Sequence, residues 1–271
     1  MKTGVPQVTP RLRVSLYGIL PVKAPIRREI GCRLLVEEKV MRARAVMRSA
    51  VAAFAVALMA SHAEAQQTIT IPLPDGHSQI QADLYGSDPR GIVLAHGGRF
   101  GKESWTPQAK ILAAKGFTVL AIQFRGDKRN PDGSTSAEGA YPDNAADVLA
   151  AVRYLHSKGM RSVSAIGGSL GGDAVGDADA AAPGEFDRVV FLGSEGGSNP
   201  EKLTGRKLYL VARDDTSGDG KRLPGIEAHF ARAPQPKKMV IVDGSAHAQY
   251  LFATDEGPRV MNEILQFITR P

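Results

Sequence analysis

The sequence predicts an α/β protein with a doubly wound, mostly parallel sheet in a single domain, and three observations support this prediction. Short apolar runs alternate with helix-length segments from Ile92 to the end of the chain. The first of these runs, Ile92–Ala95, is apolar without interruption, as in a parallel strand that helices cover on both faces. Turns rich in glycine and polar residues follow the runs, where such sheets bind their ligands. We expect the crossovers between the strands to be right-handed.

Residues 41–65 have the order of a secretory signal peptide. A basic segment at Met41–Arg48 precedes eleven apolar residues at Ala50–Ala60 and the small-residue end Ala63-Glu64-Ala65. The apolar run is short, because a helix that spans a bilayer needs about 20 residues. We therefore predict cleavage after Ala65 and a periplasmic or secreted location. An uncleaved membrane anchor and a buried helix are the alternatives.

Residues 1–40 show no lasting hydrophobic periodicity. Upstream of a signal peptide that starts at Met41 or Met47, such a segment makes little sense as part of a targeting design. We expect an unstructured or non-native extension here, with Met41 as the initiator, and a single folded domain in residues 66–271.

The charge balance argues against a nucleic-acid partner. The whole chain has a formal net charge of +6, but residues 1–65 hold 11 of its 34 basic and 4 of its 28 acidic residues. Residues 66–271 therefore carry 23 basic and 24 acidic residues. The sole cysteine, Cys32, also precedes residue 66, so the expected domain has neither a disulfide nor a thiolate site. A cysteine-free domain is compatible with an oxidising periplasm.

The expected domain begins with a hairpin at the edge of the sheet. Thr68–Leu73 and Ile80–Tyr85 alternate polar and apolar residues on either side of the turn Pro74-Asp75-Gly76. Ile92–Ala95 is apolar throughout and predicts a central parallel strand. We expect a helix at Glu103–Lys115 next, followed by a buried strand at Phe117–Phe124.

Helices and strands alternate in the remainder of the chain. We predict helices at Asp143–Ser157, Leu170–Ala180, Gly225–Ala233 and Pro258–Thr269. We predict strands at Ser162–Ile166, Arg188–Leu192, Lys207–Ala212 and Lys238–Val242. The longest irregular stretch is Arg125–Pro142, so no insertion is long enough for a full lid.

The turn after the strand Ser162–Ile166 contains the pattern G-x-S-x-G, as Gly167-Gly168-Ser169-Leu170-Gly171. Between a strand and a helix, this pattern is typical of a nucleophile elbow. The serine of an elbow is held in a strained turn, and side chains two positions before and after it would clash. On the pentapeptide alone, an ordinary glycine-rich loop with a structural or phosphate-contacting serine is the alternative.

Two other strand ends carry groups that can assist a serine. Asp214 and Asp215 follow the strand Lys207–Ala212, and His247 follows the last strand in Gly244-Ser245-Ala246-His247. Because the carboxyl ends of parallel strands meet at one edge, we expect these side chains to lie near Ser169. An imidazole can take the proton of a serine, and a carboxylate can hold the imidazole in the required tautomer.

With these motifs in this order, the chain from about Thr68 to Pro271 resembles the α/β-hydrolase family. Within that family it is similar to the small, lidless dienelactone-hydrolase-like and serine-esterase or acylaminopeptidase-like members. His96-Gly97-Gly98 and Phe124-Arg125-Gly126, at two further strand ends, add to the resemblance. The resemblance implies a sheet of the α/β-hydrolase type, with Ser169 as nucleophile, Asp215 as acid and His247 as base. Asp214 and Glu195 are the alternatives for the acid.

An oxyanion hole near the serine needs two backbone N–H donors. We expect Leu170 to supply one and Gly98 the other, with Arg99 as the alternative to Gly98. His96 is expected to shape this turn without a catalytic role. The expected reaction is acyl transfer from a small-molecule ester to Ser169, followed by hydrolysis of the acyl-enzyme. Peptidase or lactone hydrolase activity is the alternative, and a non-catalytic binding protein is the alternative from another class.

The sequence predicts no cofactor and no metal site. Gly98–Lys102 lacks the residues of a phosphate loop, and no G-x-G-x-x-G pattern opens a helix. Asp215, Ser217 and Asp219 partly resemble a calcium loop, but Ile226 occupies the place of its bidentate glutamate. We expect neither nucleic acid nor, after signal cleavage, a membrane as a partner. The sequence does not indicate an oligomeric state.

Three weaker expectations concern the surroundings of the site. Trp105 and Tyr141 are candidates for lining the substrate pocket. The segment after His247, with Tyr250, Leu251 and Phe252, is expected to pack beneath the site. A solvated helix face is expected from three acidic residues of the helix after the elbow: Asp173, Asp177 and Asp179.

Overall fold

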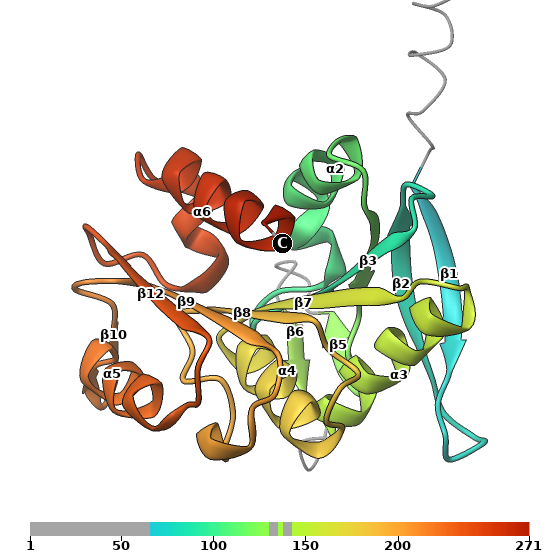
Figure 1. Cartoon of the computed structure of the whole chain (residues 1–271), viewed down its shortest axis with the longest axis horizontal. Helices are drawn as coiled ribbons and strands as arrows, with labels where there is room; N and C mark the ends of the chain where they lie inside the picture. The colour runs from blue at the N-terminus through green and yellow to red at the C-terminus, as the bar shows by residue number, and fades with distance from the viewer. Residues whose placement is uncertain (1–65, 130–134, 138–142, 271) are drawn as a thin grey trace, which may run out of the picture. The chain divides into compact units, whose positions relative to one another are not determined.

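The computed structural model describes residues 66–129, 135–137 and 143–270 (Figure 1). The expected extension and signal peptide lie outside the described residues, as do Tyr141 and parts of the loop before it. The predictions for those segments therefore stay predictions. Within the described ranges, no helix has both the length and the apolar character that crossing a membrane requires.

An eight-stranded sheet in the order β1-β2-β4-β3-β7-β8-β9-β12 forms the centre of the domain. Its strands are β1 (Gln67–Pro72), β2 (Gln79–Tyr85), β3 (Arg90–Ala95), β4 (Thr118–Ile122), β7 (Ser162–Gly168), β8 (Arg188–Leu192), β9 (Arg206–Ala212) and β12 (Lys237–Val242). All neighbours from β4 to β12 are parallel, whereas β2 is antiparallel to both β1 and β4. The prediction of a doubly wound, mostly parallel sheet in one domain is confirmed.

The predicted edge hairpin is formed by β1 and β2. Their register pairs Ile71 with Ile80, and both side chains are buried. Neighbouring residues on each strand point to the opposite face, because side chains alternate along a strand. The alternation in the sequence therefore marks the antiparallel strand pair at one margin of the sheet, where one face stays open to solvent.

Helices cover both faces of the sheet (Figure 1). The helices α3 (Asn144–Ser157), α4 (Leu170–Ala181) and α5 (Leu223–Arg232) pack on one face, and α2 (Thr106–Ala114) and α6 (Gly257–Thr269) on the other. Along β3, Val93 points into the first layer of core, whereas Ile92 and Leu94 point into the second. Each such buried aliphatic side chain contributes about 1.5–3 kcal/mol to stability.

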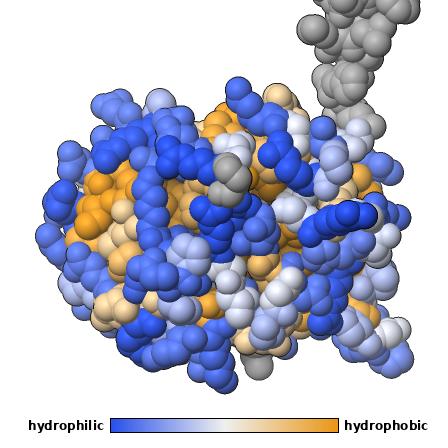
Figure 2. Space-filling view, viewed as in Figure 1, coloured by the Kyte–Doolittle hydropathy of each residue, from blue (hydrophilic) through white to orange (hydrophobic). Residues whose placement is uncertain are grey.

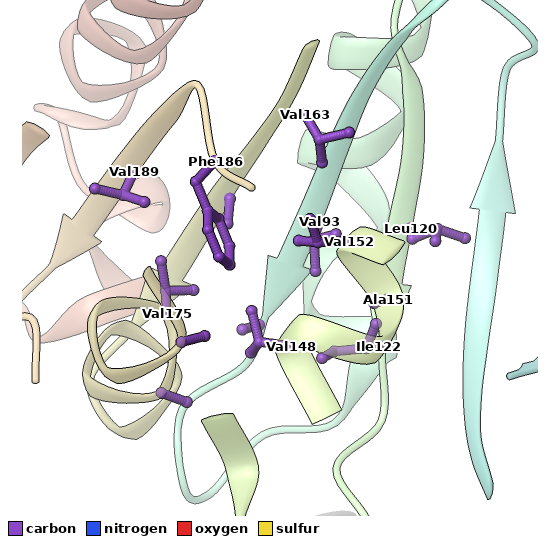
Figure 3. Close-up of a cluster of buried hydrophobic side chains, with 14 of the residues drawn as sticks. Val93, Leu120, Ile122, Val148, Ala151, Val152, Val163, Val175, Phe186 and Val189 are labelled. Atoms are coloured by element: carbon purple, nitrogen blue, oxygen red, sulfur yellow. The ribbon is translucent and has the colours of Figure 1, made fainter. Parts of the chain in front are cut away.

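The first of these core layers is built mainly from valine and alanine (Figure 3). Val93 of β3, Val148 and Val152 of α3 and Val175 of α4 gather between the sheet and these two helices. Small side chains bring α3 and α4 close to the strands that end at the candidate site. The surface of the described residues that faces the viewer is largely hydrophilic, with smaller hydrophobic areas between (Figure 2).

Several short elements are absent from the sequence-based prediction. They are the 3₁₀ helices η1 (Lys102–Trp105), η2 (Pro200–Lys202) and η3 (Ala248–Ala253), and the two-stranded ribbons β5 (Asp127–Arg129) with β6 (Thr135–Ala137) and β10 (Thr216–Ser217) with β11 (Gly220–Lys221). The predicted helix at Glu103–Lys115 begins as η1 and becomes α-helical at Thr106. Pro107 favours that start, because proline lacks an N–H and suits the first turn of a helix.

Candidate active site

Ser169 occupies a strained turn between β7 and α4. Its φ of 50° and ψ of −122° lie outside the regions that residues with a side chain prefer. The Ser169 N–H donates to the carbonyl oxygen of Leu192 at 2.9 Å, and its own carbonyl accepts from the N–H groups of Gly172 and Asp173. Hydrogen bonds on both sides of the residue therefore hold the strained conformation in place.

The two outer glycines of the pattern are required by close backbone contacts. A Cβ on Gly167 would collide with the carbonyl of Gly171, and a Cβ on Gly171 would collide with the carbonyl of Ala95 at the end of β3. These clashes involve backbone atoms, which cannot move aside as a flexible side chain can. The clash expected from the sequence is thus present at the positions two before and two after the serine.

His247 and Asp215 are joined at the same edge of the sheet. His247 follows β12, Asp215 follows β9, and His247 Nδ1 lies 2.7 Å from Asp215 Oδ2. The Asp215 carboxylate is buried, and its other oxygen lies 3.5 Å from Arg222 Nε in an ion pair. Because an ionised carboxylate only accepts hydrogen bonds, the imidazole carries a proton on Nδ1 and leaves Nε2 as its acceptor.

The other two candidate acids lie elsewhere. Asp214 is 55% exposed and accepts a hydrogen bond from Lys221 Nζ at 2.8 Å, and this hydrogen bond lowers the pKa of Asp214. Glu195 is exposed on the loop after β8. Of the three carboxylates that the sequence offered, the structure brings Asp215 to His247.

The segments that carry Ser169 and His247 are in contact. A Cβ on Gly168 would lie 3.3 Å from the Cβ of Ala248 and would collide with the side chain of Gln249. Gly193 follows Leu192, whose carbonyl accepts the hydrogen bond from Ser169. A Cβ on Gly193 would lie 3.0 Å from His247 Nδ1 and 3.1 Å from Asp215 Oδ2. The serine, the imidazole and the carboxylate therefore gather over the ends of β7, β8, β9 and β12.

The turn after β3 is shaped by a buried, neutral histidine. His96 Nδ1 lies 2.9 Å from the carbonyl oxygen of Gly97, and His96 Nε2 faces Gln123 Nε2 at 3.1 Å and the N–H of Phe124 at 3.4 Å. The imidazole thus donates through Nδ1 and accepts through Nε2. Burial lowers the pKa of His96 to about 4, so the ring is uncharged at neutral pH. This arrangement fits the structural role expected for His96.

The two expected oxyanion donors lie close together. Leu170 is the first residue of α4, so its N–H has no acceptor within the helix. A Cβ on Gly98 would lie 3.7 Å from Leu170 Cδ2, which places the turn after β3 beside the start of α4. Gly98 and Arg99 are both exposed at this point.

Gln249 is a residue of this region that the sequence analysis missed. It is 7% exposed, its Nε2 donates to Ser104 Oγ at 3.2 Å, and its Oε1 has no hydrogen-bond partner among the described residues. Ala248 before it has a φ of 51°, and Ser169 is the other non-glycine residue with a positive φ in the described ranges. The strained turn at Ala248 directs Gln249 against Gly168. The one signal in the sequence is Gly168 itself, a glycine at a variable position of the pattern.

A cleft of about 360 Å³ opens beside Ser169. It lies between the loop after β8, the acidic side of α4 and the start of α5. Its border includes Asp173 and Asp177 of α4, Glu195 of the loop, Arg222 just before α5 and Ile226 within α5. Most of the bordering side chains are polar, and Ile226 is the apolar exception.

The prediction of a solvated acidic face on α4 is wrong for Asp179, whereas Asp173 and Asp177 are partly exposed at the cleft. Asp173 accepts a hydrogen bond from Ser194 Oγ at 2.7 Å, and Asp177 accepts one from the N–H of Ser198 at 2.7 Å. Asp179 is fully buried, where it accepts from the N–H of Thr204 at 2.8 Å. Burial raises the pKa of Asp179. These carboxylates fasten the chain between β8 and β9 to α4.

Two aromatic residues differ from their predicted positions. Trp105 does not line the pocket: it is 1% exposed and packs edge to face against Phe252, with 5.9 Å between ring centroids. Tyr250 does not pack beneath the site: it is 56% exposed and its ring lies 5.0 Å from that of Phe100. Leu251 is buried as predicted. The 3₁₀ turn of η3 separates these neighbours in space, which the sequence did not reveal.

No cluster of three or more His, Cys, Asp or Glu side chains suited to a metal ion occurs within the described ranges.

Comparisons with known proteins agree with this architecture. Residues 92–263 match the model of the alpha/beta hydrolase family. No curated protein sequence matches the chain.

Several solved structures share the fold. A predicted CIB-like hydrolase from Thermoplasma acidophilum is 19% identical, with a TM-score of 0.57 over 75% of this chain and 98% of its own. A dienelactone hydrolase from Anabaena variabilis is 18% identical, with a TM-score of 0.58 over 76% and 96%. An esterase from a Rhodococcus species is 16% identical, with a TM-score of 0.58 over 74% and 98%. At these identities, the similarity establishes the fold alone.

Proposed function

Because the chain belongs to the alpha/beta hydrolase family, we propose that it is a serine hydrolase that cleaves small carboxylic esters through an acyl-enzyme. The observation that carries the proposal is the 2.7 Å contact between His247 Nδ1 and Asp215 Oδ2, at the sheet edge where Ser169 occupies its strained turn. The esterase and dienelactone hydrolase among its structural neighbours support ester or lactone cleavage.

In the proposed mechanism, Asp215 holds the Nδ1–H of His247, so that Nε2 can accept the proton of Ser169. Ser169 Oγ then attacks the carbonyl carbon, and the electron pair moves onto the carbonyl oxygen. The N–H groups of Leu170 and Gly98 donate to this oxyanion, with Arg99 as the alternative second donor. His247 passes its proton to the leaving alcohol. His247 next takes a proton from water, whose oxygen attacks the acyl-enzyme. The bond between the acyl carbon and Ser169 Oγ then breaks, His247 returns the proton to Ser169 Oγ, and the acid is released.

The form of the cleft supports small, polar substrates. Its volume of about 360 Å³ is near the lower end of the range for small-molecule sites, and its border is mostly polar. Long lipid esters would find little apolar surface in it. Amides and lactones use the same attack by serine and remain the second candidates for the substrate bond.

Two measurements on the full chain test this proposal. A fluorophosphonate probe, which reacts with activated serines, should label the wild-type protein and fail to label Ser169→Ala. p-Nitrophenyl acetate and butyrate should be turned over faster than aminoacyl anilides or a simple δ-lactone. Full esterase turnover by Ser169→Ala would contradict the proposal, and a preference for anilides would replace the esterase by a peptidase. A folded wild-type protein that neither reacts with the probe nor hydrolyses any ester would favour a binding protein.

We also propose that this hydrolase is exported. The order of residues 41–65 supports cleavage after Ala65, with residues 1–40 as an extension and residues 66–271 as the mature domain. N-terminal sequencing of the protein from its native cells should give Gln66 as the first residue. A protein that begins at residue 1 would contradict the export proposal.

A further inference from the structure

The cleft beside Ser169 carries more negative than positive charge. Three carboxylates border it, from Asp173, Asp177 and Glu195, against a single guanidinium from Arg222. Arg222 Nε lies 3.5 Å from the buried carboxylate of Asp215, so much of its charge is opposed from within the protein. A substrate group in the cleft therefore meets an excess of negative charge.

Two of the three carboxylates have a role in the fold that needs no ligand. Asp173 Oδ1 accepts from Ser194 Oγ, and Asp177 Oδ1 accepts from the N–H of Ser198. Both side chains fasten the loop after β8 to α4. Their presence in the cleft is explained by that loop, although their charge still acts on whatever enters.

Glu195 has no such role. Its carboxylate makes neither a hydrogen bond nor an ion pair with another residue in the part of the chain that the structure describes. Burial lowers the pKa of His229, although the nearby charge of Glu195 acts in the opposite direction. The His229 imidazole therefore stays neutral and does not compensate the Glu195 carboxylate. Stability of the fold gives no reason for a glutamate at this position.

The backbone around Glu195 nevertheless places its carboxylate over the cleft. A Cβ on Gly225, in the first turn of α5, would collide with Glu195 Oε1, so the absence of a side chain at Gly225 makes room for the carboxylate. Gly196 and Gly197, which follow Glu195, have φ values of 83° and 91° and turn the loop back toward α4. The carboxylate is thus held between α5 and the loop, on the border of the space that contains Ser169.

We propose that this cleft selects esters with a positively charged acyl or alcohol group, and that Glu195 determines the preference. The inference rests on the proposed function, because the cleft holds substrate if Ser169 is the nucleophile. None of the described residues that border the cleft is aromatic, so it lacks a cation–π cage. Attraction to carboxylates is the remaining source of selectivity, and it serves any ammonium group of suitable size.

Two pairs of substrates isolate charge from shape. Acetylthiocholine and 3,3-dimethylbutyl thioacetate differ by one quaternary nitrogen in place of a carbon on the leaving-group side. p-Nitrophenyl 4-(trimethylammonio)butanoate and p-nitrophenyl 5,5-dimethylhexanoate differ in the same way on the acyl side. In at least one pair, kcat/KM should be about tenfold higher for the cation at low ionic strength, and the ratio should shrink in 0.5 M salt because exposed charges are screened.

Glu195→Gln should lower kcat/KM for the preferred cation about three- to tenfold and leave its neutral partner unchanged. The matched control is Glu227→Gln, which removes an exposed carboxylate of α5 that does not border the cleft. It should leave both substrates unchanged.

The outcomes separate this inference from the proposed function. Equal kcat/KM for cation and neutral partner in both pairs would overturn the charge preference, as would an equal loss for both partners in Glu195→Gln. A protein that reacts with the fluorophosphonate probe but hydrolyses no cationic ester would also overturn it, with the proposed function intact. A protein that neither reacts with the probe nor hydrolyses any of the four substrates would contradict the proposed function itself, and the inference with it.

Discussion

Asp215→Asn should abolish most of the esterase activity, and the structure indicates why the loss should be large. The carboxylate lies between His247 Nδ1 at 2.7 Å and Arg222 Nε at 3.5 Å. An amide there has one oxygen and one NH₂ group to offer. With its oxygen toward Arg222, its NH₂ faces the imidazole and forces the histidine proton onto Nε2, where it blocks proton transfer from Ser169.

The opposite orientation of that amide sets its NH₂ against the guanidinium, donor against donor. Arg222 therefore favours the orientation that is wrong for catalysis. We expect kcat to fall by about 10³- to 10⁴-fold, which corresponds to about 4–5.5 kcal/mol of transition-state stabilisation. Removal of the negative charge adds to this loss, because the imidazolium formed during attack is no longer stabilised.

The assay is steady-state hydrolysis of p-nitrophenyl acetate, with circular dichroism to verify that the variant is folded. Asp214→Asn is the matched control, because Asp214 is exposed and pairs with Lys221 at the surface. Surface pairs contribute about 0–1 kcal/mol, so kcat should stay within about twofold of wild type. A folded Asp215→Asn protein that retains a tenth or more of kcat would refute the reasoning, and so would an equal loss in Asp214→Asn.

Three further predictions follow from the packing around the site. Gly171→Ala should lower the free energy of unfolding by about 3 kcal/mol or more, because its Cβ would collide with the Ala95 carbonyl. Gly218→Ala is the control, because the space around Gly218 is open, and it should change that free energy by less than about 0.5 kcal/mol. Denaturant unfolding measures both values. Gly168→Ala should displace the Gln249 amide and lower kcat. The double variant Gly168→Ala with Gln249→Ala should be about 1 kcal/mol more stable than Gly168→Ala alone. Strictly additive effects of the two substitutions on the free energy of unfolding would contradict the contact between these residues. Finally, burial lowers the pKa of His96 to about 4 in the folded protein, below its value in the unfolded chain. The unfolded chain therefore binds a proton that the folded protein does not, and the free energy of unfolding should fall by about 3 kcal/mol as the pH drops from 6.5 toward 4. An NMR titration that placed the His96 imidazole near pH 6.5 would disprove this assignment.

The central strands are predictable from the sequence because each is a short, mainly apolar run between polar turns. β8 begins and ends at the residues that the pattern indicated, Arg188 and Leu192. The strained turn at Ser169 was also open to prediction, because a tight turn between a strand and a helix excludes side chains two positions before and after its central residue. Strand ends then brought distant residues to one edge, by the topology of parallel sheets alone.

The burial and orientation of several side chains at the site could not be predicted from the sequence. α4 consists mainly of alanine, glycine and aspartate, so its hydrophobic pattern has little contrast, and Asp179 could not be recognised as buried. The choice of Asp215 over Asp214 depends on which carboxylate turns inward after β9, and adjacent residues in a sequence do not reveal that. Gln249 acquires its position from the 3₁₀ helix η3 and its contact with Gly168, and Glu195 from the loop after β8 and its contact with Gly225.

The central claim is that Ser169 is a nucleophile activated by His247. The most direct measurement is mass spectrometry of the full chain after reaction with a fluorophosphonate, followed by digestion and sequencing of the modified peptide. We predict a single adduct on Ser169, with His247→Ala reacting at least about 10³-fold more slowly than wild type. An adduct on another residue, or an undiminished rate in His247→Ala, would contradict the account.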